Sequence, residues 1–311
     1  MPGNQERGRR TIVFLHIARC GGSTLKNMLD LYFANSRILR ASLLHREGNR
    51  VEGIAAGSAT PVSFNADMER YHCVSGHSNL DDLLTIFPEA DYIAMLRDPV
   101  KRVVSLYNYW RSHTQSFVEK EKLAGPALAR SLSLEEFIES DETVVRFAVR
   151  NGMARQLFRG LTSRFEGREE DLLAESIEKI DRFAFVGLTD MFDLSIWLLC
   201  ETFGWAYPDN LQDANRPTQN LQSTEIFEAV DQTPPPAAVQ TRIRELNAID
   251  CALYQHTVQR FGEACFATLG NQREPFRSGR KGSKGKPPLL LKRVANRLIR
   301  VLTDYTHPTN M

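Results

Sequence analysis

A short stretch near the start of the chain constrains its fold more than any other. It runs Thr11-Ile-Val-Phe-Leu-His-Ile-Ala-Arg-Cys-Gly-Gly-Ser-Thr-Leu25. Its apolar first half is typical of a buried strand, and the spacing of Leu25, Met28 and Leu29 predicts a helix after the glycines. A strand, a glycine turn and a helix N-terminus direct free backbone N–H groups and the positive end of the helix dipole at one point. The stretch therefore predicts a cradle for a phosphate or sulfate group.

The side chains of this stretch strengthen the prediction. Arg19 carries a permanent positive charge within the turn, and the hydroxyls of Ser23 and Thr24 can donate hydrogen bonds. The stretch is not a Walker A loop, which needs a Lys directly before the Ser or Thr. A strand, two glycines and a helix also occur in ordinary turns, so this motif alone does not decide between the two interpretations.

A second stretch supports the anion-binding interpretation. It runs Asp91-Tyr-Ile-Ala-Met-Leu-Arg-Asp-Pro-Val-Lys-Arg-Val-Val-Ser-Leu-Tyr-Asn-Tyr109. Residues 92–96 predict another buried strand, and Asp98 followed by Pro99 predicts the start of a helix that ends near residue 112. Arg97 then leaves the carboxyl end of the strand, and Ser105 lies on the second turn of the helix. A guanidinium and a hydroxyl so placed suit a second phosphate.

Together, the two stretches resemble the motifs of PAPS-dependent sulfotransferases (PAPS is 3′-phosphoadenosine 5′-phosphosulfate), most of all the bacterial and glycan 2-O-sulfotransferase-like branch. The resemblance implies a three-layer α/β sandwich with a central, mainly parallel sheet, a P-loop-like nucleotide-binding architecture and a helical C-terminal half. It also implies that the first motif binds the 5′-phosphosulfate and that the second binds the 3′-phosphate. The implied donor-binding residues are Arg19, Cys20, Gly21, Gly22, Ser23, Thr24, Arg97 and Ser105.

A histidine follows a further strand, predicted within residues 71–78. His77 comes directly after Gly76 and is expected at the same sheet edge as Arg19 and Arg97, the edge where ligands bind in open α/β sheets. In the resembling family a Gly-His at this place carries the proposed general base, which takes the proton of an acceptor hydroxyl. The alternative is a histidine bonded only to backbone carbonyls. His16 could line the site or be buried in its strand.

The resemblance implies a reaction in which a sulfuryl group passes in line from PAPS to a hydroxyl, leaving 3′,5′-ADP (PAP). Arg19 and His77 are then the expected catalytic residues. Many relatives have Lys where Arg19 stands, and Arg cannot readily lend a proton to the bridging oxygen. We expect no metal ion, because the sequence shows no ligand cluster and its five Cys form no CxxC pair.

The acceptor and the alternatives stay open. A glycan hydroxyl is the acceptor that the resemblance suggests, with a lipid headgroup or a small alcohol as alternatives, and no nucleic-acid partner is expected. One alternative function is a P-loop-like, ATP-dependent kinase, against which the missing Walker Lys argues. Another is a non-catalytic, membrane-associated module that binds nucleotide or glycan.

The remaining sequence predicts three regions. Residues 1–10 are expected to be disordered, residues 11–270 to form the sulfotransferase domain, and residues 271–311 to form a basic linker and an amphipathic helix. Residues 275–303 contain nine Lys or Arg and no acidic residue. Residues 287–302 could lie on an anionic membrane surface or pack on the domain itself, and both interpretations stay open. Without a visible targeting segment, we expect a bacterial, cytoplasmic protein, with peripheral contact at the inner membrane surface as one option.

Three further expectations concern the fold. The Gly- and Ala-rich stretch up to Pro61 and the charged stretch of residues 115–130 are both expected to be surface excursions. One continuous helix is expected over residues 237–261. Asn151 and Arg155 resemble a family segment near the cleft, but a plain polar pair on a helix surface explains them equally well.

Overall fold

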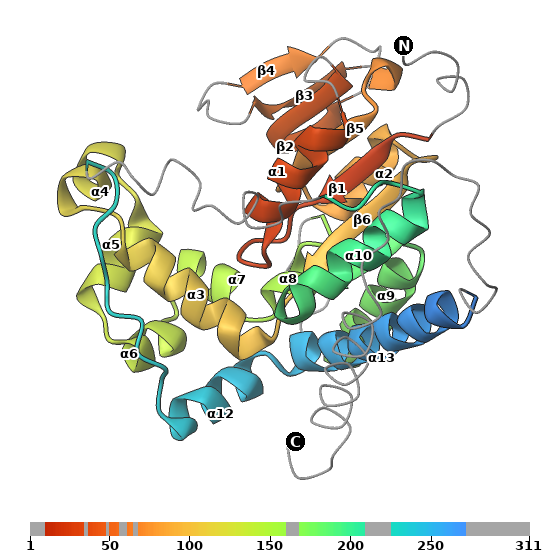
Figure 1. Ribbon diagram of the computed structural model, residues 1–311. Coiled ribbons are helices and arrows are strands. Elements are labelled where there is room, and N and C mark those ends of the chain that lie inside the picture. Colours follow the sequence, from red (N-terminus) through yellow and green to blue (C-terminus); the bar gives the residue numbers. More distant parts are fainter. Residues whose placement is uncertain are drawn as a thin grey trace.

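The computed structural model describes residues 10–33, 37–47, 50–55, 61–64, 68–159, 168–208 and 225–271. Its centre is a seven-stranded sheet of order β4-β3-β2-β5-β1-β6-β7 (Figure 1). The strands are β1 (Ile12–Leu15), β2 (Ile38–Glu47), β3 (Arg50–Ala55), β4 (Pro61–Phe64), β5 (Cys73–Gly76), β6 (Asp91–Leu96) and β7 (Phe185–Leu188). Residues 1–9 and 272–311, which include the predicted basic tail, lie outside the described residues.

The five strands from β2 to β7 in this order run parallel, and β1 lies in their middle. Leu15 pairs with Gly76 of β5 on one side and with Ala94 of β6 on the other. Every residue of β1 is buried, as expected for a central strand covered on both faces. The carboxyl ends of β1, β5, β6 and β7 therefore meet at one edge of the sheet.

Helices cover both faces of the sheet, which confirms the predicted three-layer α/β class. On one face, Tyr32 of α1 (Gly22–Tyr32) stacks on Trp205, which follows α10 (Phe192–Phe203), with ring centroids 4.6 Å apart. On the other face, α2 (Leu80–Ile86) and α9 (Glu169–Asp181) are joined by the ion pair between Asp81 and Lys179. The last helix, α13 (Ala248–Asn271), packs against α9, α10 and β7.

The described part of the stretch before Pro61, up to residue 47 and over residues 50–55, is not the expected surface excursion. β2 continues to Glu47, and β3 and β4 extend the sheet in antiparallel pairing. Leu44 and Val51 are buried in this extension. The β2–β3 register shifts between Ala41 and Leu43, as happens at β-bulges.

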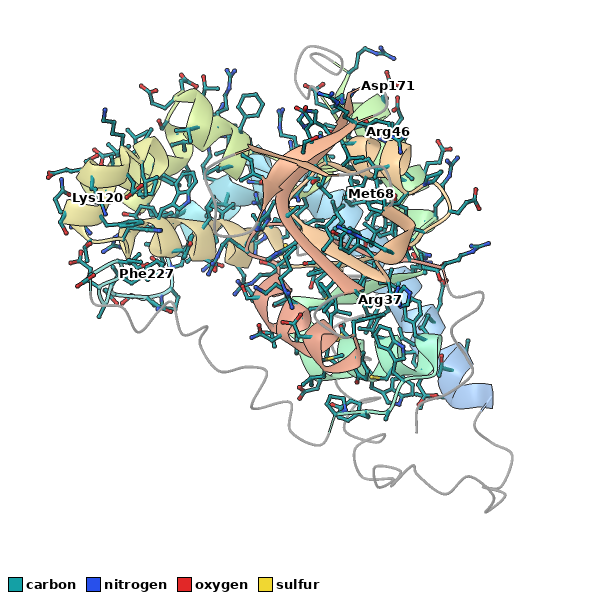
Figure 2. The ribbon with its side chains drawn as sticks, turned by 90° about the horizontal axis from the view of Figure 1, so that it is seen from above. Arg37, Arg46, Met68, Lys120, Asp171 and Phe227 are labelled. Carbon is teal, nitrogen blue, oxygen red and sulfur yellow. The ribbon has the colours of Figure 1, made fainter. Side chains whose placement is uncertain are left out.

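A second apolar core lies beside the sheet, among helices that follow β6. These are α3 (Pro99–Arg111), α4 (Gln115–Glu121), α5 (Ala124–Ser131), α6 (Leu134–Glu139), α7 (Thr143–Val149), α8 (Gly152–Arg155) and, later in the chain, α12 (Ala237–Leu246). Val103, Phe137 and Ile243 are fully buried in this core. Figure 2 shows Lys120 and Phe227 together at the outer end of this helical region.

Two expectations about these helices are wrong. Residues 115–130 pack as α4 and α5, because each helix has an apolar side that includes buried Val118 or Ala129. The helix expected over residues 237–261 is broken into α12 and α13 at Asn247. The Asn247 side chain accepts the N–H of Asn151 at 2.9 Å, so a long-range contact fixes the break. Among the described helices, none is long and apolar enough to cross a bilayer.

Candidate active site

The backbone of the first motif forms a tight loop between β1 and α1. Arg19 has a φ of 67° and Gly21 a φ of 76°, both in the left-handed region, and Gly21 is the N-cap of α1. No side chain caps this helix. The N–H groups of its first turn, which have no intrahelical acceptor, therefore remain available to an anion. A Cβ on Gly21 would lie 3.1 Å from the Thr189 methyl group, so the loop also packs closely on the end of β7.

Arg19 extends from this loop to α3. Its Nε and Nη2 atoms donate to the Ser105 hydroxyl at 3.2 and 3.1 Å, and its guanidinium lies over the Tyr109 ring, 4.4 Å from the ring centroid. The Ser105 oxygen accepts both bonds, so its own proton remains free to donate. Ser105 was expected to act beside Arg97. The structure instead connects it to Arg19, through a contact that links the two motifs.

Arg97 brings a second cation to the same loop. Its Nη1 donates to the Arg19 carbonyl at 3.2 Å, while its Nε is buried with no hydrogen-bond partner among the described residues. A buried, unpaired donor costs roughly 1–3 kcal/mol, and an anion would satisfy it. Burial lowers the pKa of Arg19, and the neighbouring Arg97 lowers it further, partly offset by Tyr109. Two partly desolvated guanidiniums side by side fit the phosphate groups of a nucleotide.

Cys20 differs from the other residues of the loop. Its side chain is fully buried, its backbone N–H donates to the Ile17 carbonyl at 3.3 Å, and its thiol is 3.8 Å from the Ala18 carbonyl. Burial raises the pKa of the Cys20 thiol to about 12, so it stays protonated at neutral pH. The residue predicted to contact the donor thus faces the core, and its N–H is already used by the turn.

His77 lies at the same sheet edge and contacts the loop through His16. The two imidazoles stack with centroids 4.1 Å apart, and the His77 Nδ1 is 2.8 Å from the His16 carbonyl oxygen. The His16 ring in turn packs on Gly22, where a Cβ would lie 1.9 Å from it. Burial lowers the pKa of His16 to about 3, and it also lowers the pKa of His77, although the hydrogen bond to the His16 carbonyl opposes that shift. Both rings are therefore neutral at pH 7, as a general base must be.

Asp190 fixes the start of the helix that carries Ser105. Its carboxylate accepts the backbone N–H of Asp98 at 3.0 Å, the Lys101 ammonium at 2.5 Å and the Tyr254 hydroxyl at 2.9 Å. These bonds favour the charged carboxylate, and the pKa of Asp190 is lowered although burial opposes the shift. Sequence reasoning missed this role, because residues 98, 190 and 254 meet only in the folded chain.

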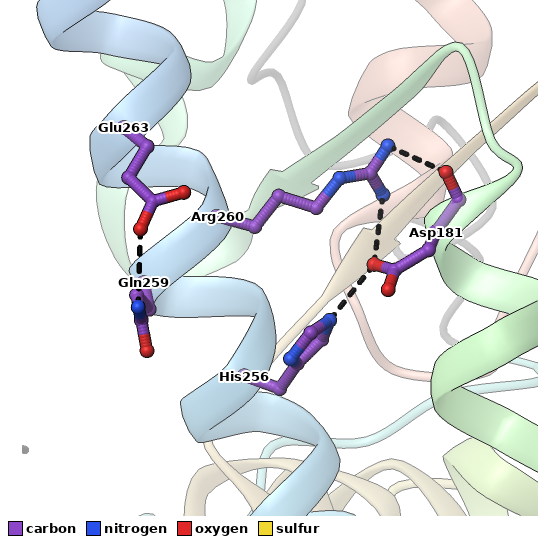
Figure 3. Close-up of a pocket in the computed structure, with 5 residues that line it drawn as sticks. All are labelled: Asp181, His256, Gln259, Arg260 and Glu263. Carbon is purple, nitrogen blue, oxygen red and sulfur yellow. Dashed lines mark hydrogen bonds and ion pairs between the residues drawn. The ribbon is translucent and has the colours of Figure 1, made fainter. Parts of the chain in front are cut away.

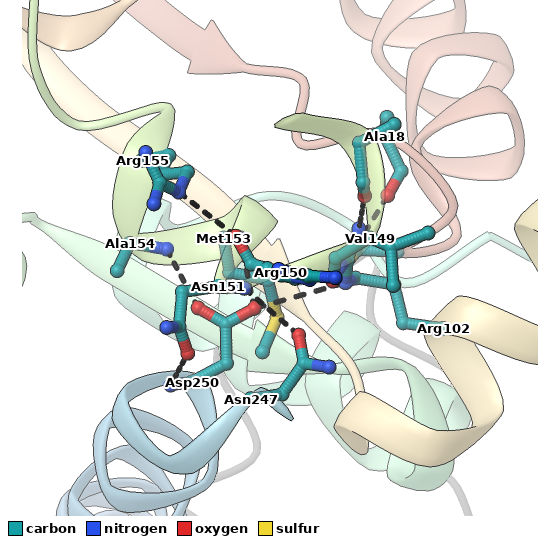
Figure 4. Close-up of polar contacts among 12 residues, drawn as sticks. Ala18, Arg102, Val149, Arg150, Asn151, Met153, Ala154, Arg155, Asn247 and Asp250 are labelled. Carbon is teal, nitrogen blue, oxygen red and sulfur yellow. Dashed lines mark hydrogen bonds and ion pairs between the residues drawn. The ribbon is translucent and has the colours of Figure 1, made fainter. Parts of the chain in front are cut away.

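Asn151 holds the scaffold together beneath the site (Figure 4). Its Oδ1 accepts the backbone N–H of Asp250 at 3.1 Å, while its own N–H donates to Asn247. The buried Asp250 carboxylate accepts the N–H groups of Met153 and Ala154 and lies 3.8 Å from the Arg102 Nε. Asn151 is thus half-buried, and its side-chain oxygen and backbone N–H both bond to α13 and the residue before it.

Arg155, the other residue of that family-like segment, has local partners. Its Nε donates to the Arg150 carbonyl at 2.9 Å, and its guanidinium lies 5.6 Å from the centroid of the Phe147 ring. The structure gives it no contact with Arg19, Arg97 or His77 among the described residues.

A pocket elsewhere on the surface has a different explanation. It is lined by Asp181, His256, Gln259, Arg260 and Glu263, between α9 and α13 (Figure 3). Arg260 donates to the carbonyls of Ile180, Asp181 and Phe183 at 2.7–3.0 Å, and His256 contacts the Asp181 carboxylate at 2.8 Å. These groups satisfy the C-terminal end of α9. Within the described ranges, no group of three or more His, Cys, Asp or Glu is arranged to hold a metal ion, and the metal-free reaction stays a prediction.

The fold and the cradle together define an α/β protein with a cationic site for a phosphate- or sulfate-bearing ligand. Residues 1–278 match the Galactose-3-O-sulfotransferase family, and the chain belongs to that family. It is 25% identical to Galactose-3-O-sulfotransferase 3 of Homo sapiens over 270 residues, which cover 82% of this chain and 58% of the human protein. The Mus musculus protein of the same name gives 25% identity over 275 residues, with the same shares covered.

The chain thus spans less than two thirds of the length of these curated relatives. A crystal structure of a sulfotransferase from Alicyclobacillus acidocaldarius matches with a TM-score of 0.39 and 14% identity, covering 80% of this chain and 95% of that one. The predicted sulfotransferase family is confirmed, although the matching branch is the galactose-3-O one and not the 2-O-like branch that the two motifs suggested. The two motifs are the ones predicted to bind the donor, and a donor-binding motif carries little information on the acceptor.

Proposed function

We propose that this protein transfers a sulfuryl group from PAPS to a hydroxyl of a galactose-containing glycan or glycolipid, with the galactose 3-hydroxyl as the specific acceptor. The observation that carries the proposal is the contact of Arg19, Arg97 and Ser105 around the uncapped N-terminus of α1, beside a neutral His77. Family membership supports both the reaction and the acceptor class. Bound PAPS would supply the sulfuryl group and be released as PAP.

Each residue of the site has a distinct task in this proposal. Arg19 and the N–H groups of the first turn of α1 stabilise the negative charge that develops on the 5′-phosphate side. Arg97 binds the 3′-phosphate, and its buried Nε gains a partner there. His77 accepts the proton of the attacking hydroxyl at Nε2. Positioning and electrostatics supply most of the rate in this kind of transfer.

Calorimetric titration with PAP, ADP and ATP, each with and without Mg²⁺, tests the donor. We expect PAP to bind without metal, to bind tighter than ADP because of its 3′-phosphate, and to bind at least tenfold weaker to Arg97→Ala. Arg182→Ala is the matched control, since Arg182 pairs with Glu178 on the exposed side of α9. A preference for ATP with Mg²⁺, or indifference to the 3′-phosphate, would refute the proposal and favour a kinase.

The acceptor is tested separately with PAPS and a panel of galactosides. A terminal galactoside should become sulfated, whereas the matching 3-deoxy galactoside should not. Sulfation of the 3-deoxy compound at an equal rate would refute the 3-hydroxyl as the acceptor position. Sulfation of simple alcohols or lipids in preference to any galactoside would refute the galactose class itself.

A further inference from the structure

We propose that His16 and Gln156 are positioning residues that hold His77 in the tautomer and orientation that a general base requires. The inference rests on the proposed role of His77 and deepens it. Neither residue is expected to touch the reacting atoms. Gln156 acts through the backbone carbonyl of His16, and His16 acts through this carbonyl and through its own imidazole ring.

The tautomer follows from the hydrogen bond of His77. Its Nδ1 is 2.8 Å from the His16 carbonyl oxygen. A carbonyl oxygen only accepts hydrogen bonds, so Nδ1 has to carry the proton, and Nε2 of the neutral ring keeps its lone pair. A free histidine side chain in water favours the opposite tautomer. The His16 carbonyl therefore selects the form of His77 whose Nε2 can accept a proton.

Gln156 fixes this carbonyl from the other side. Its Nε2 donates to the same His16 oxygen at 2.9 Å, which uses the second lone pair. The backbone carbonyl of Gln156 accepts the N–H of Leu80 at 3.1 Å, three residues after His77. Gln156 thus holds both the acceptor of the His77 hydrogen bond and the far end of the turn that carries His77.

The His16 ring fixes the orientation of His77 and its spacing from the donor loop. The ring stacks on His77 at 4.1 Å with an interplanar angle of 28°, and on Phe14 at 5.3 Å. Its edge lies against Gly22, the first residue of α1. One imidazole therefore separates the base from the helix N-terminus that binds the donor. After burial, His77, Lys26 of α1 and Arg19 of the loop are the groups whose positive charge opposes protonation of the His16 ring.

Nitrogen NMR of histidine-labelled protein tests the tautomer without any turnover. In the full chain, we expect the neutral His77 ring to be protonated at Nδ1. In Gln156→Ala, we expect the population to shift toward the Nε2-protonated form. Gln259→Ala on α13, whose side chain donates to Glu263 at 3.0 Å, is the matched control and should leave His77 unchanged. Protonation at Nε2 in the unaltered protein, or no shift in Gln156→Ala, would overturn the inference.

Kinetics with PAPS and a galactoside then test the consequence. Gln156→Ala should lower kcat about tenfold while PAP affinity stays within twofold, because the anion cradle is not altered. His16→Phe keeps an aromatic ring and the carbonyl, so it should be about tenfold more active than His16→Ala. A tautomer shift in Gln156→Ala with unchanged kcat would overturn the positioning role. Absence of any sulfotransfer by the unaltered protein, together with the expected tautomer result, would refute the proposed function while leaving the geometry of His77 intact.

Discussion

Replacement of His16 by Phe should remove much of the acid sensitivity of folding. The pKa of His16 is about 3 in the folded protein because its ring is buried, against 6.5 for the ordinary side chain. The folded pKa lies below the unfolded one, so the unfolded chain binds the proton first as pH falls. Stability is then lost progressively below pH 6.5, down to about pH 3. Phe does not titrate, and it can keep the stacking on Phe14 and His77.

The magnitude follows from the size of the shift. Each pH unit between the two pKa values changes the free energy of unfolding by about 1.4 kcal/mol. Between pH 7.5 and pH 4.5, about two pH units lie below the ordinary pKa of 6.5 and above the folded pKa of about 3. The wild-type protein should therefore lose about 3 kcal/mol more stability than His16→Phe over this interval. His77 titrates in the same direction in both proteins, and its charge also lowers the pKa of His16, so the comparison reports His16 together with its coupling to His77.

Urea unfolding at the two pH values, followed by circular dichroism, measures this difference. His45→Phe is the matched control, since His45 is exposed on β2, and its pH dependence should follow that of the wild-type protein. Parallel loss of stability in wild type and His16→Phe, with a difference below about 1 kcal/mol, would refute the burial argument. It would mean that the His16 ring reaches water, or another group, when it is protonated.

Three further predictions concern the scaffold. Gly21→Ala should destabilise the protein by about 1 kcal/mol or more in thermal unfolding, because the residue has a φ of 76° and a Cβ would press on Thr189. It should also weaken PAP binding, and equal stability of the two proteins would contradict the reasoning. Asp250→Ala should lower the free energy of unfolding in urea by about 3–5 kcal/mol, because it leaves Arg102 as a buried charge without its carboxylate. A decrease below about 1 kcal/mol would contradict the buried pair. Cys20 should resist iodoacetamide at pH 8 in the folded protein, because its thiol is buried with a pKa of about 12, and mass spectrometry would reveal any rapid labelling.

The sequence predicted those parts of the site that depend on neighbouring residues. The β1–α1 loop and the Asp98–Pro99 start of α3 follow from local strand, turn and capping preferences, and both occur as expected. Parallel strands then place His77 and Arg97 at one edge, since sheet topology brings carboxyl ends together. Ser105 lies on α3 as expected, and its role in donor binding stays a prediction; its contact with Arg19 depends on the rotation of α3 relative to the loop.

Other parts could not be predicted because their signals are not local. Gln156 reaches His16 from 140 positions away. It directly follows the family-like segment with Asn151 and Arg155, but that segment gave no role to Gln156 itself. Tyr109 had a weak signal, since it lies one helical turn after Ser105 on the same side of α3. The β2–β4 extension was missed because Gly and Ala residues obscure the alternation that marks a strand. The break at Asn247 depends on a partner, Asn151, at the N-cap of α8.

The long-range hydrogen bonds of α13 also affect the stage of protein synthesis at which the site can fold. All residues of the anion cradle lie before residue 106, yet Asp250 and Tyr254 support α8 and the start of α3. A nascent chain that has left the ribosome only as far as α12 contains every donor-binding side chain but lacks these supports. Contacts of such high sequence separation form late in folding. Donor binding should therefore appear only once α13 has docked.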